Sequence, residues 1–267
     1  FNEVDMLVCA DLSYVGWDGI VEKEEVSLEE ACRKYLSLYS EKELKSKYTF
    51  SMNLPHLIDA LQDTIRYGNI KLKNYKKVYS DEDVIQFSVV TLVLPDGSLV
   101  LSFSGTDGSI TGWKENLMMT YSKDLPCQIL AKDYVKETIA DIPETSYLFG
   151  LKKKKVYPKM YLTGHSKGGN LAMYAYLKNP KLQGYIEGVK SFDGPGFADG
   201  FWQGDEDVSK ITNYIPKDSI VGRALDHREQ TKVLDAQGSG LVQHDTLMWS
   251  VDVKDFNYCD ALTKESD

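Results

Sequence analysis

A serine enclosed by glycines, in the stretch 164–169 with the sequence GHSKGG, is the feature that most constrains the fold of this chain. The residues before it, 156–163, are β-prone, and apolar residues recur at helical spacing after it, over 171–177. Ser166 is therefore expected at a sharp turn from a strand into a helix, a nucleophile elbow. The glycines two positions on either side remove side chains that would clash with the strand and the helix. The pattern predicts a strained serine beside the positive end of a helix dipole.

The chain length favours one large domain. At 267 residues, the chain can bury a sizeable core, and no Pro/Gly/Ser-rich spacer, low-complexity tract or internal repeat divides it. We expect a single domain over 1–267, with 1–80 a largely helical flanking region and 84–267 the catalytic core. The hydrophobic content of 42% is typical of a folded protein rather than a disordered one.

Strand and helix patterns alternate along most of the chain. A capping box at 27–30 predicts a helix over 31–39, and Leu54, Leu57, Ile58, Leu61 and Ile65 form one helix face. The pattern predicts a hairpin of two strands, 84–94 and 99–104, joined by the turn 95–98. A helix is expected over 124–140, and three further strands are expected over 188–192, 211–215 and 231–234. This order predicts an α/β fold, with a mostly parallel central sheet, helices on both faces and an antiparallel part at one side.

A serine nucleophile needs a base, and the chain has four histidines. His56 lies in the N-terminal helical region, His165 adjoins the serine with its side chain expected to point into packing, and His227 lies in a charged segment. His244 follows the last β-prone run and precedes an apolar helical pattern. We therefore expect His244 to be the base.

The base needs a carboxylate that holds its tautomer. The chain order Ser, Asp or Glu, His restricts the search to residues 167–243, where two aspartates follow predicted strands. Asp193 follows the first strand after the elbow and Asp218 follows the second. Since the acid in this order normally comes from the later strand, we expect Asp218, with Asp193 as the alternative.

The oxyanion of an acyl-transfer intermediate needs two backbone donors. One is expected to be the N–H of Lys167, directly after the serine. The second is expected from the strand end at 103–108, where the N–H or hydroxyl of Thr106 follows a glycine that permits close approach. Trp113 is placed on a helix beside the mouth of the site, in the core rather than in a lid.

Charge and cysteine usage restrict the partners. The net charge of −9 argues against nucleic acid binding. The only basic run, 152–155, is read as a solvated loop, with a local patch for an anionic surface or substrate group as the alternative. The four cysteines form no metal-ligand spacing and read as reduced thiols, so we expect no metal and no cofactor.

No apolar stretch is long enough to span a membrane and no signal peptide is visible, which favours a cytoplasmic location. Because the chain begins at Phe1, removal of a leader and secretion stay possible.

These pieces together resemble the class 3 lipase-like branch of the α/β-hydrolase superfamily. The turn 103–106 resembles its F-x-G-T/S turn, and 164–169 its G-H-S-x-G-G elbow. The stretches 5–14, 191–197 and 243–245 are similar to a bacterial family of lipase-like hydrolases, the DUF2974 or Mbeg1-like group. The resemblance implies the α/β-hydrolase fold, a Ser-Asp-His triad and acyl-ester chemistry, and it supplies no substrate. Lipases of this branch often carry Arg where this chain has Ser104.

The sequence thus predicts a serine hydrolase that cleaves a carboxylic ester, with a small acyl ester or lipid as substrate. Two alternatives stand beside it. One is a thioesterase, acyltransferase or peptidase that uses the same triad. The other is a non-catalytic binding or scaffold protein that keeps the fold, since a fold does not guarantee activity.

Overall fold

A central sheet organises the computed structural model, which describes residues 1–40, 42–44, 54–147 and 152–263. In these ranges the sheet has eight strands in the order β1-β2-β3-β4-β7-β8-β9-β10. The strands are β1 (Val26–Ser27), β2 (Lys71–Ser80), β3 (Ile85–Val93), β4 (Leu99–Phe103), β7 (Met160–His165), β8 (Ile186–Phe192), β9 (Ile211–Pro216) and β10 (Gln230–Leu234). Two small ribbons, β5 (Glu144–Tyr147) with β6 (Lys152–Lys155) and β11 (Val251–Asp252) with β12 (Asp255–Phe256), lie outside it.

The sheet is parallel on one side and antiparallel on the other. Strands β4, β7, β8, β9 and β10 pair in parallel, whereas β1 to β4 pair antiparallel. The predicted hairpin is confirmed, since β3 and β4 pair antiparallel across the turn at 95–98. The mostly parallel α/β architecture is therefore as expected.

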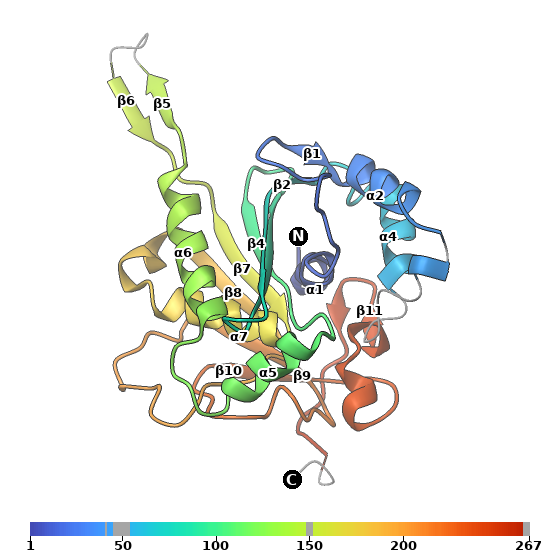
Figure 1. The fold of residues 1–267 in the computed structure, drawn as a ribbon, viewed down its shortest axis with the longest axis vertical. Coiled ribbons are helices and arrows are strands. Elements are labelled where there is room, and N and C mark those ends of the chain that lie inside the picture. The colour runs from blue at the N-terminus through green and yellow to red at the C-terminus, as the bar shows by residue number, and fades with distance from the viewer. Residues whose placement is uncertain (41, 45–53, 148–151, 264–267) are drawn as a thin grey trace.

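Helices cover both faces of the sheet (Figure 1). They are α1 (Glu3–Leu12), α2 (Leu28–Ser37), α4 (Leu54–Gln62), α5 (Ile110–Met118), α6 (Pro126–Ala140) and α7 (Lys167–Leu177), with short 3-10 helices η1 (Pro180–Tyr185), η2 (Gly240–His244) and η3 (Thr246–Met248). One apolar core lies between the sheet and α1, α2 and α4. The other lies between the sheet and α6 and α7. This arrangement explains why the central strands β4, β7 and β9 are buried along almost their whole length.

Some local expectations are confirmed and others are wrong. Ser27 caps α2 by accepting the N–H of Glu30, which is the N-cap bond of the predicted capping box, and the helix covers Leu28–Ser37 rather than 31–39. Residues 71–80, however, form β2 inside the region expected to be largely helical. Ile65 lies past the end of α4 and is 95% exposed, so it does not belong to that helix face. The lysine run 152–155 forms strand β6, paired with β5, rather than a loop.

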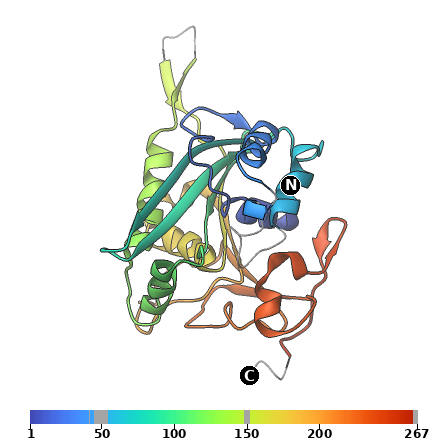
Figure 2. The same ribbon diagram turned by 45° about the vertical axis from the view of Figure 1, so that its right-hand side comes forward.

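The chain folds back so that its C-terminal part lies against α1 (Figure 2). The Asn2 side chain donates to the carbonyl of Lys254 at 2.7 Å, and the hydroxyl of Thr246 donates to the carboxyl group of Asp11 at 3.0 Å. The second contact anchors η3 to α1, and His244 at the end of η2 lines the same pocket as His165 and Ser166 at the carboxyl end of β7. That edge of a parallel sheet is where loops gather into a site.

Candidate active site

Ser166 occupies the turn between β7 and α7, as the elbow pattern predicts. Its backbone has φ 57° and ψ −130°, a region that L-residues rarely adopt, and its N–H donates to the carbonyl of Phe192 at 2.9 Å. A Cβ at Gly168 would lie 2.1 Å from the carbonyl oxygen of Phe103, and one at Gly164 would lie 2.3 Å from Gly168. The two glycines therefore permit the close packing that keeps the serine strained and half-buried.

His244 is oriented by Asp193. At the end of η2, Nδ1 of His244 lies 2.6 Å from Oδ2 of Asp193, which directly follows β8. The other carboxylate oxygen of Asp193 accepts hydrogen bonds from the Ser219 hydroxyl and from the N–H of Gly222. Asp193 is fully buried, whereas His244 is partly accessible. A buried carboxylate on Nδ1 leaves Nε2 of the imidazole available to take a proton.

The preferred acid, Asp218, lies elsewhere, and the expectation that it holds His244 is corrected. Its carboxylate accepts from the Gln243 amide at 3.0 Å and from the Thr263 hydroxyl, and its N–H donates to Gln243. Asp218 thus fixes the residue before His244 rather than the imidazole. The physical reason is that the loop after β8, not the loop after β9, faces Nδ1 of His244.

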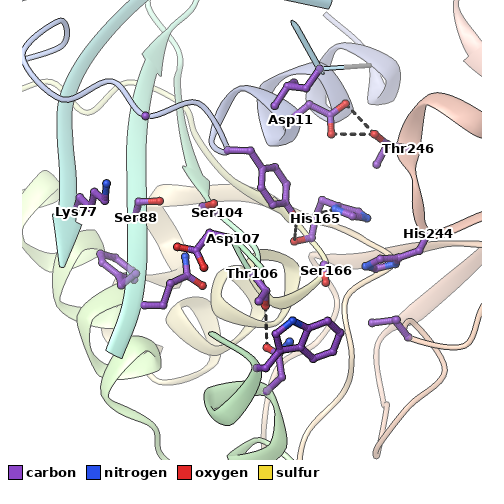
Figure 3. A pocket seen from close by; sticks show the side chains of 18 of the residues that line it. Asp11, Lys77, Ser88, Ser104, Thr106, Asp107, His165, Ser166, His244 and Thr246 are labelled. Carbon is purple, nitrogen blue, oxygen red and sulfur yellow. Dashed lines mark hydrogen bonds between the residues drawn. The ribbon is translucent and has the colours of Figure 1, made fainter. Parts of the chain in front are cut away.

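The turn after β4 lies beside the elbow. Thr106 lines the same pocket as Ser166, and its hydroxyl donates to Oδ1 of Asn116 at 2.9 Å (Figure 3). Because that proton is engaged, the backbone N–H of Thr106 is the better donor for an oxyanion than its hydroxyl. Lys167 is the first residue of α7, so its N–H is one of the helix N–H groups that lack an intrahelical acceptor. The two residues expected to supply donors are thus close to Ser166, since Lys167 follows it in the chain and Thr106 lines the same pocket.

Of the remaining histidines, only His165 reaches this site. Its ring lies 4.5 Å from that of His244, centroid to centroid, and its Nδ1 is 2.8 Å from the Tyr14 hydroxyl. Burial, reinforced by the neighbouring His244, lowers the pKa of His165 well below its usual range, so the ring is neutral. His227 instead pairs with Glu229 at 2.6 Å, and His56 lies on α4.

A pocket of about 390 Å³ opens over Ser166. Figure 3 shows Ser166 and His244 side by side at its edge, with His165 and Thr106 close to them. Trp113 and Leu241 line it and are 54% and 67% exposed, so Trp113 stands at the mouth rather than in the core. The volume lies in the range of small-molecule sites.

Burial raises the pKa of two carboxyls that line this pocket, those of Asp11 and Asp245, and the effect is large for Asp11. Burial, with a smaller contribution from Asp245, raises its pKa to about 8, although the Thr246 hydroxyl acts in the opposite direction. Asp11 is therefore largely protonated at neutral pH. Together with Tyr14 and Ser219, it is a site residue whose role the sequence patterns did not single out. Asp11 and Tyr14 lie in the stretch 5–14, which carried a family resemblance but no predicted role, and the positions of all three residues depend on packing.

No group of three or more metal-ligating side chains forms within the described ranges. The four cysteines are free thiols, three of them buried. None of the helices in the same ranges combines the length and apolar composition needed to cross a bilayer. The reactive groups that the pocket itself presents include the Ser166 hydroxyl and the His244 imidazole.

A strained serine at a strand-to-helix turn on a mostly parallel sheet, followed in the chain by an aspartate and a histidine, defines the α/β-hydrolase fold. The structure is similar to that of the mono- and diacylglycerol lipase from Aspergillus oryzae (TM-score 0.54, 13% identity, 99% of this chain and 88% of that one). It is similar as well to a mutant of MDLA from Penicillium cyclopium (0.52, 12%, 98% and 86%) and to the lipase from Rhizopus microsporus var. chinensis (0.50, 11%, 97% and 78%). At these identities the likeness concerns the fold.

The chain belongs to the Mbeg1-like family, whose family model matches residues 61–267. No curated protein matches the chain in sequence. The resemblance stated from the sequence is therefore confirmed at the level of the family and the fold.

Proposed function

We propose that this protein is a serine hydrolase that cleaves carboxylic esters through an acyl-enzyme, with Ser166 as nucleophile, His244 as base and Asp193 as the acid of the triad. The contact that carries the proposal is the 2.6 Å pair between His244 and the buried Asp193, beside a serine with positive φ. Strain and a carboxylate-held imidazole are costly features that a merely structural turn does not need.

In the proposed mechanism, Nε2 of His244 takes the proton of the Ser166 hydroxyl as its oxygen attacks the ester carbonyl. The N–H groups of Lys167 and Thr106 donate to the oxyanion, and the positive end of α7 favours the same charge. His244 then gives its proton to the leaving alcohol. Water then gives a proton to His244 and attacks the acyl carbon, the bond from that carbon to Ser166 Oγ breaks, and His244 returns the proton to Oγ as the acid leaves.

The pocket supports an apolar or amphiphilic acyl ester, including a lipid, as substrate. Phe87, Val78 and Leu54 line its interior, and Trp113 and Leu241 border its opening. Apolar walls with a few polar groups at the reacting end are typical of sites that hold small organic ligands.

A fluorophosphonate probe tests the nucleophile. We expect the folded protein to be labelled on Ser166, as located by mass spectrometry of the peptides, and a panel of p-nitrophenyl esters from acetyl to palmitoyl to be hydrolysed. The Ser166→Ala variant is the matched control and should show neither labelling nor hydrolysis above background. Absence of labelling in folded wild-type protein, while a control hydrolase reacts, would overturn the proposal.

A further inference from the structure

The residue directly after the nucleophile carries a buried positive charge. The Lys167 side chain is 1% exposed, and its ammonium forms an ion pair with Glu115 of α5, whose side chain is fully buried. It also donates to the backbone carbonyl and to Oε1 of Gln86, each at 2.6 Å. An ammonium has three N–H groups, so all three have acceptors in this arrangement.

The same contacts reach the turn that holds the second oxyanion donor. The side-chain amide of Gln86 donates to the carbonyl of Gly105 at 3.3 Å. On α5, the neighbour of Glu115 is Asn116, which accepts the hydroxyl of Thr106 at 2.9 Å. Helix α5 and the turn 104–107 are therefore both tied to the elbow through the ammonium of Lys167.

Close packing at the turn makes its position sensitive to this tether. A Cβ at Gly105 would lie 2.1 Å from the Tyr14 hydroxyl and 2.8 Å from the carbonyl of His165, so the turn already touches the elbow backbone. A shift of the turn by a fraction of an ångström would change the distance from the N–H of Thr106 to the oxyanion, which is the quantity that oxyanion stabilisation depends on.

The charged pair itself does not face the substrate. Neither Lys167 nor Glu115 is among the residues that line the pocket, whereas Gln86, Thr106 and Asn116 are. Burying two charges is expensive, and a packed apolar pair of similar volume is often at least as stabilising. A gain in folding stability therefore explains the buried pair less well than a role in holding the geometry of the neighbouring site.

We propose that the buried Lys167–Glu115 ion pair, together with Gln86, positions two segments against the nucleophile elbow. These segments are helix α5 and the turn 104–107, which holds the Thr106 donor. Lys167 then has two separate tasks: its backbone N–H donates to the oxyanion, and its side chain sets the place of the Thr106 donor. Glu115 and Gln86 are positioning residues, since they act through Thr106 and Gly105. This inference rests on the proposed serine hydrolase activity.

The test compares Glu115→Gln, Lys167→Met and the double variant with the wild type. The control is Glu137→Gln, which removes the exposed pair between Glu137 and Lys76, 3.0 Å apart. Active sites are counted by fluorophosphonate titration, so that kcat refers to folded, reactive enzyme. The measured quantities are kcat and KM for a p-nitrophenyl ester, the rate constant of phosphonate labelling and the melting temperature.

We expect Glu115→Gln and Lys167→Met to lower kcat per titrated site by about 10- to 100-fold, with KM changed less than about threefold, and to slow labelling in parallel, as a displaced oxyanion donor predicts. The double variant removes the unpaired buried charge, so its melting temperature should recover relative to Lys167→Met while its kcat stays low. Glu137→Gln should match the wild type in every measurement.

Two results would separate the possible failures. If the variants keep wild-type kcat per titrated site, or if kcat recovers together with the melting temperature in the double variant, the pair is only structural and the inference is overturned. If the wild type is not labelled at all, the proposed function fails instead. Glu115→Gln is nearly isosteric and keeps a hydrogen-bond acceptor for Lys167, so it tests positioning even where the other variants do not fold.

Discussion

Replacing Asp193 with Asn removes the negative charge that faces the imidazole of His244 at 2.6 Å. At an effective dielectric constant of about 20, a unit-charge pair at this separation interacts by about 6 kcal/mol, which corresponds to between four and five orders of magnitude in rate if it is lost entirely from the transition state. An Asn amide that donates to Nδ1 would also place the imidazole proton on Nε2, where it blocks acceptance of the Ser166 proton. In a Ser-His-Asp triad this change lowers kcat by about 10⁴-fold.

The matched comparison is Asp218→Asn, at the carboxylate that the sequence favoured. Asp218 contacts Gln243 and Thr263 and not the imidazole, so its replacement should lower kcat by less than about tenfold, by loosening the loop before His244. Hydrolysis of p-nitrophenyl acetate by each variant, with circular dichroism as the folding control, measures both effects. A loss of more than about 100-fold in Asp218→Asn together with near wild-type activity in Asp193→Asn would refute this assignment of the acid.

Three further substitutions test separate parts of the structure. Gly168→Ala places a Cβ 2.1 Å from the carbonyl oxygen of Phe103, so we expect a loss of at least about 3 kcal/mol in the free energy of unfolding, measured by denaturant titration. Ser219→Ala removes a hydroxyl donor from the buried carboxylate of Asp193 and should lower kcat about tenfold in the ester assay. The raised pKa of Asp11, about 8, means that the folded state holds a proton that the unfolded chain releases near pH 4, so stability falls as pH rises from about 4 to 8. Asp11→Asn should remove this fall and raise the melting temperature more at pH 8 than at pH 5, with a gain in unfolding free energy of roughly 5 kcal/mol at most.

Each of these three expectations has an outcome that contradicts it. A Gly168→Ala protein as stable as the wild type would show that the elbow and β4 are not in close contact. An unchanged kcat in Ser219→Ala would mean that the remaining donor, the N–H of Gly222, suffices to hold Asp193. Equal effects of Asp11→Asn at both pH values would show that this carboxyl is ionised in the folded state.

Local features of the site were predictable from short stretches of sequence. The elbow at Ser166 depends on glycines within two residues and on the strand and helix that flank it, so neighbouring residues alone determine the turn. The hairpin of β3 and β4 and the Ser27 cap of α2 have the same local origin. Strand β2 was not predicted, because its lysines interrupt the apolar alternation and most of its residues are only partly buried.

The acid could not be chosen from the sequence. Asp193 and Asp218 follow adjacent parallel strands, β8 and β9, so both reach the same edge of the sheet. The usual chain order of a triad favours the later aspartate but gives no information on its distance from His244. The choice depends on where η2 places Nδ1 of His244. That placement is set by contacts between distant parts of the chain, including the hydrogen bonds from Thr246 to Asp11.

Local spacing and periodicity are enough to predict a serine at a strained strand-to-helix turn, a mostly parallel sheet that supports it, and His244 as an available base. The folded chain was needed to see that Asp193 holds the imidazole of His244 and that Lys167 is buried against Glu115. These contacts join residues far apart in the chain, 51 and 52 positions in the two cases, and packing of distant segments fixes which partners meet.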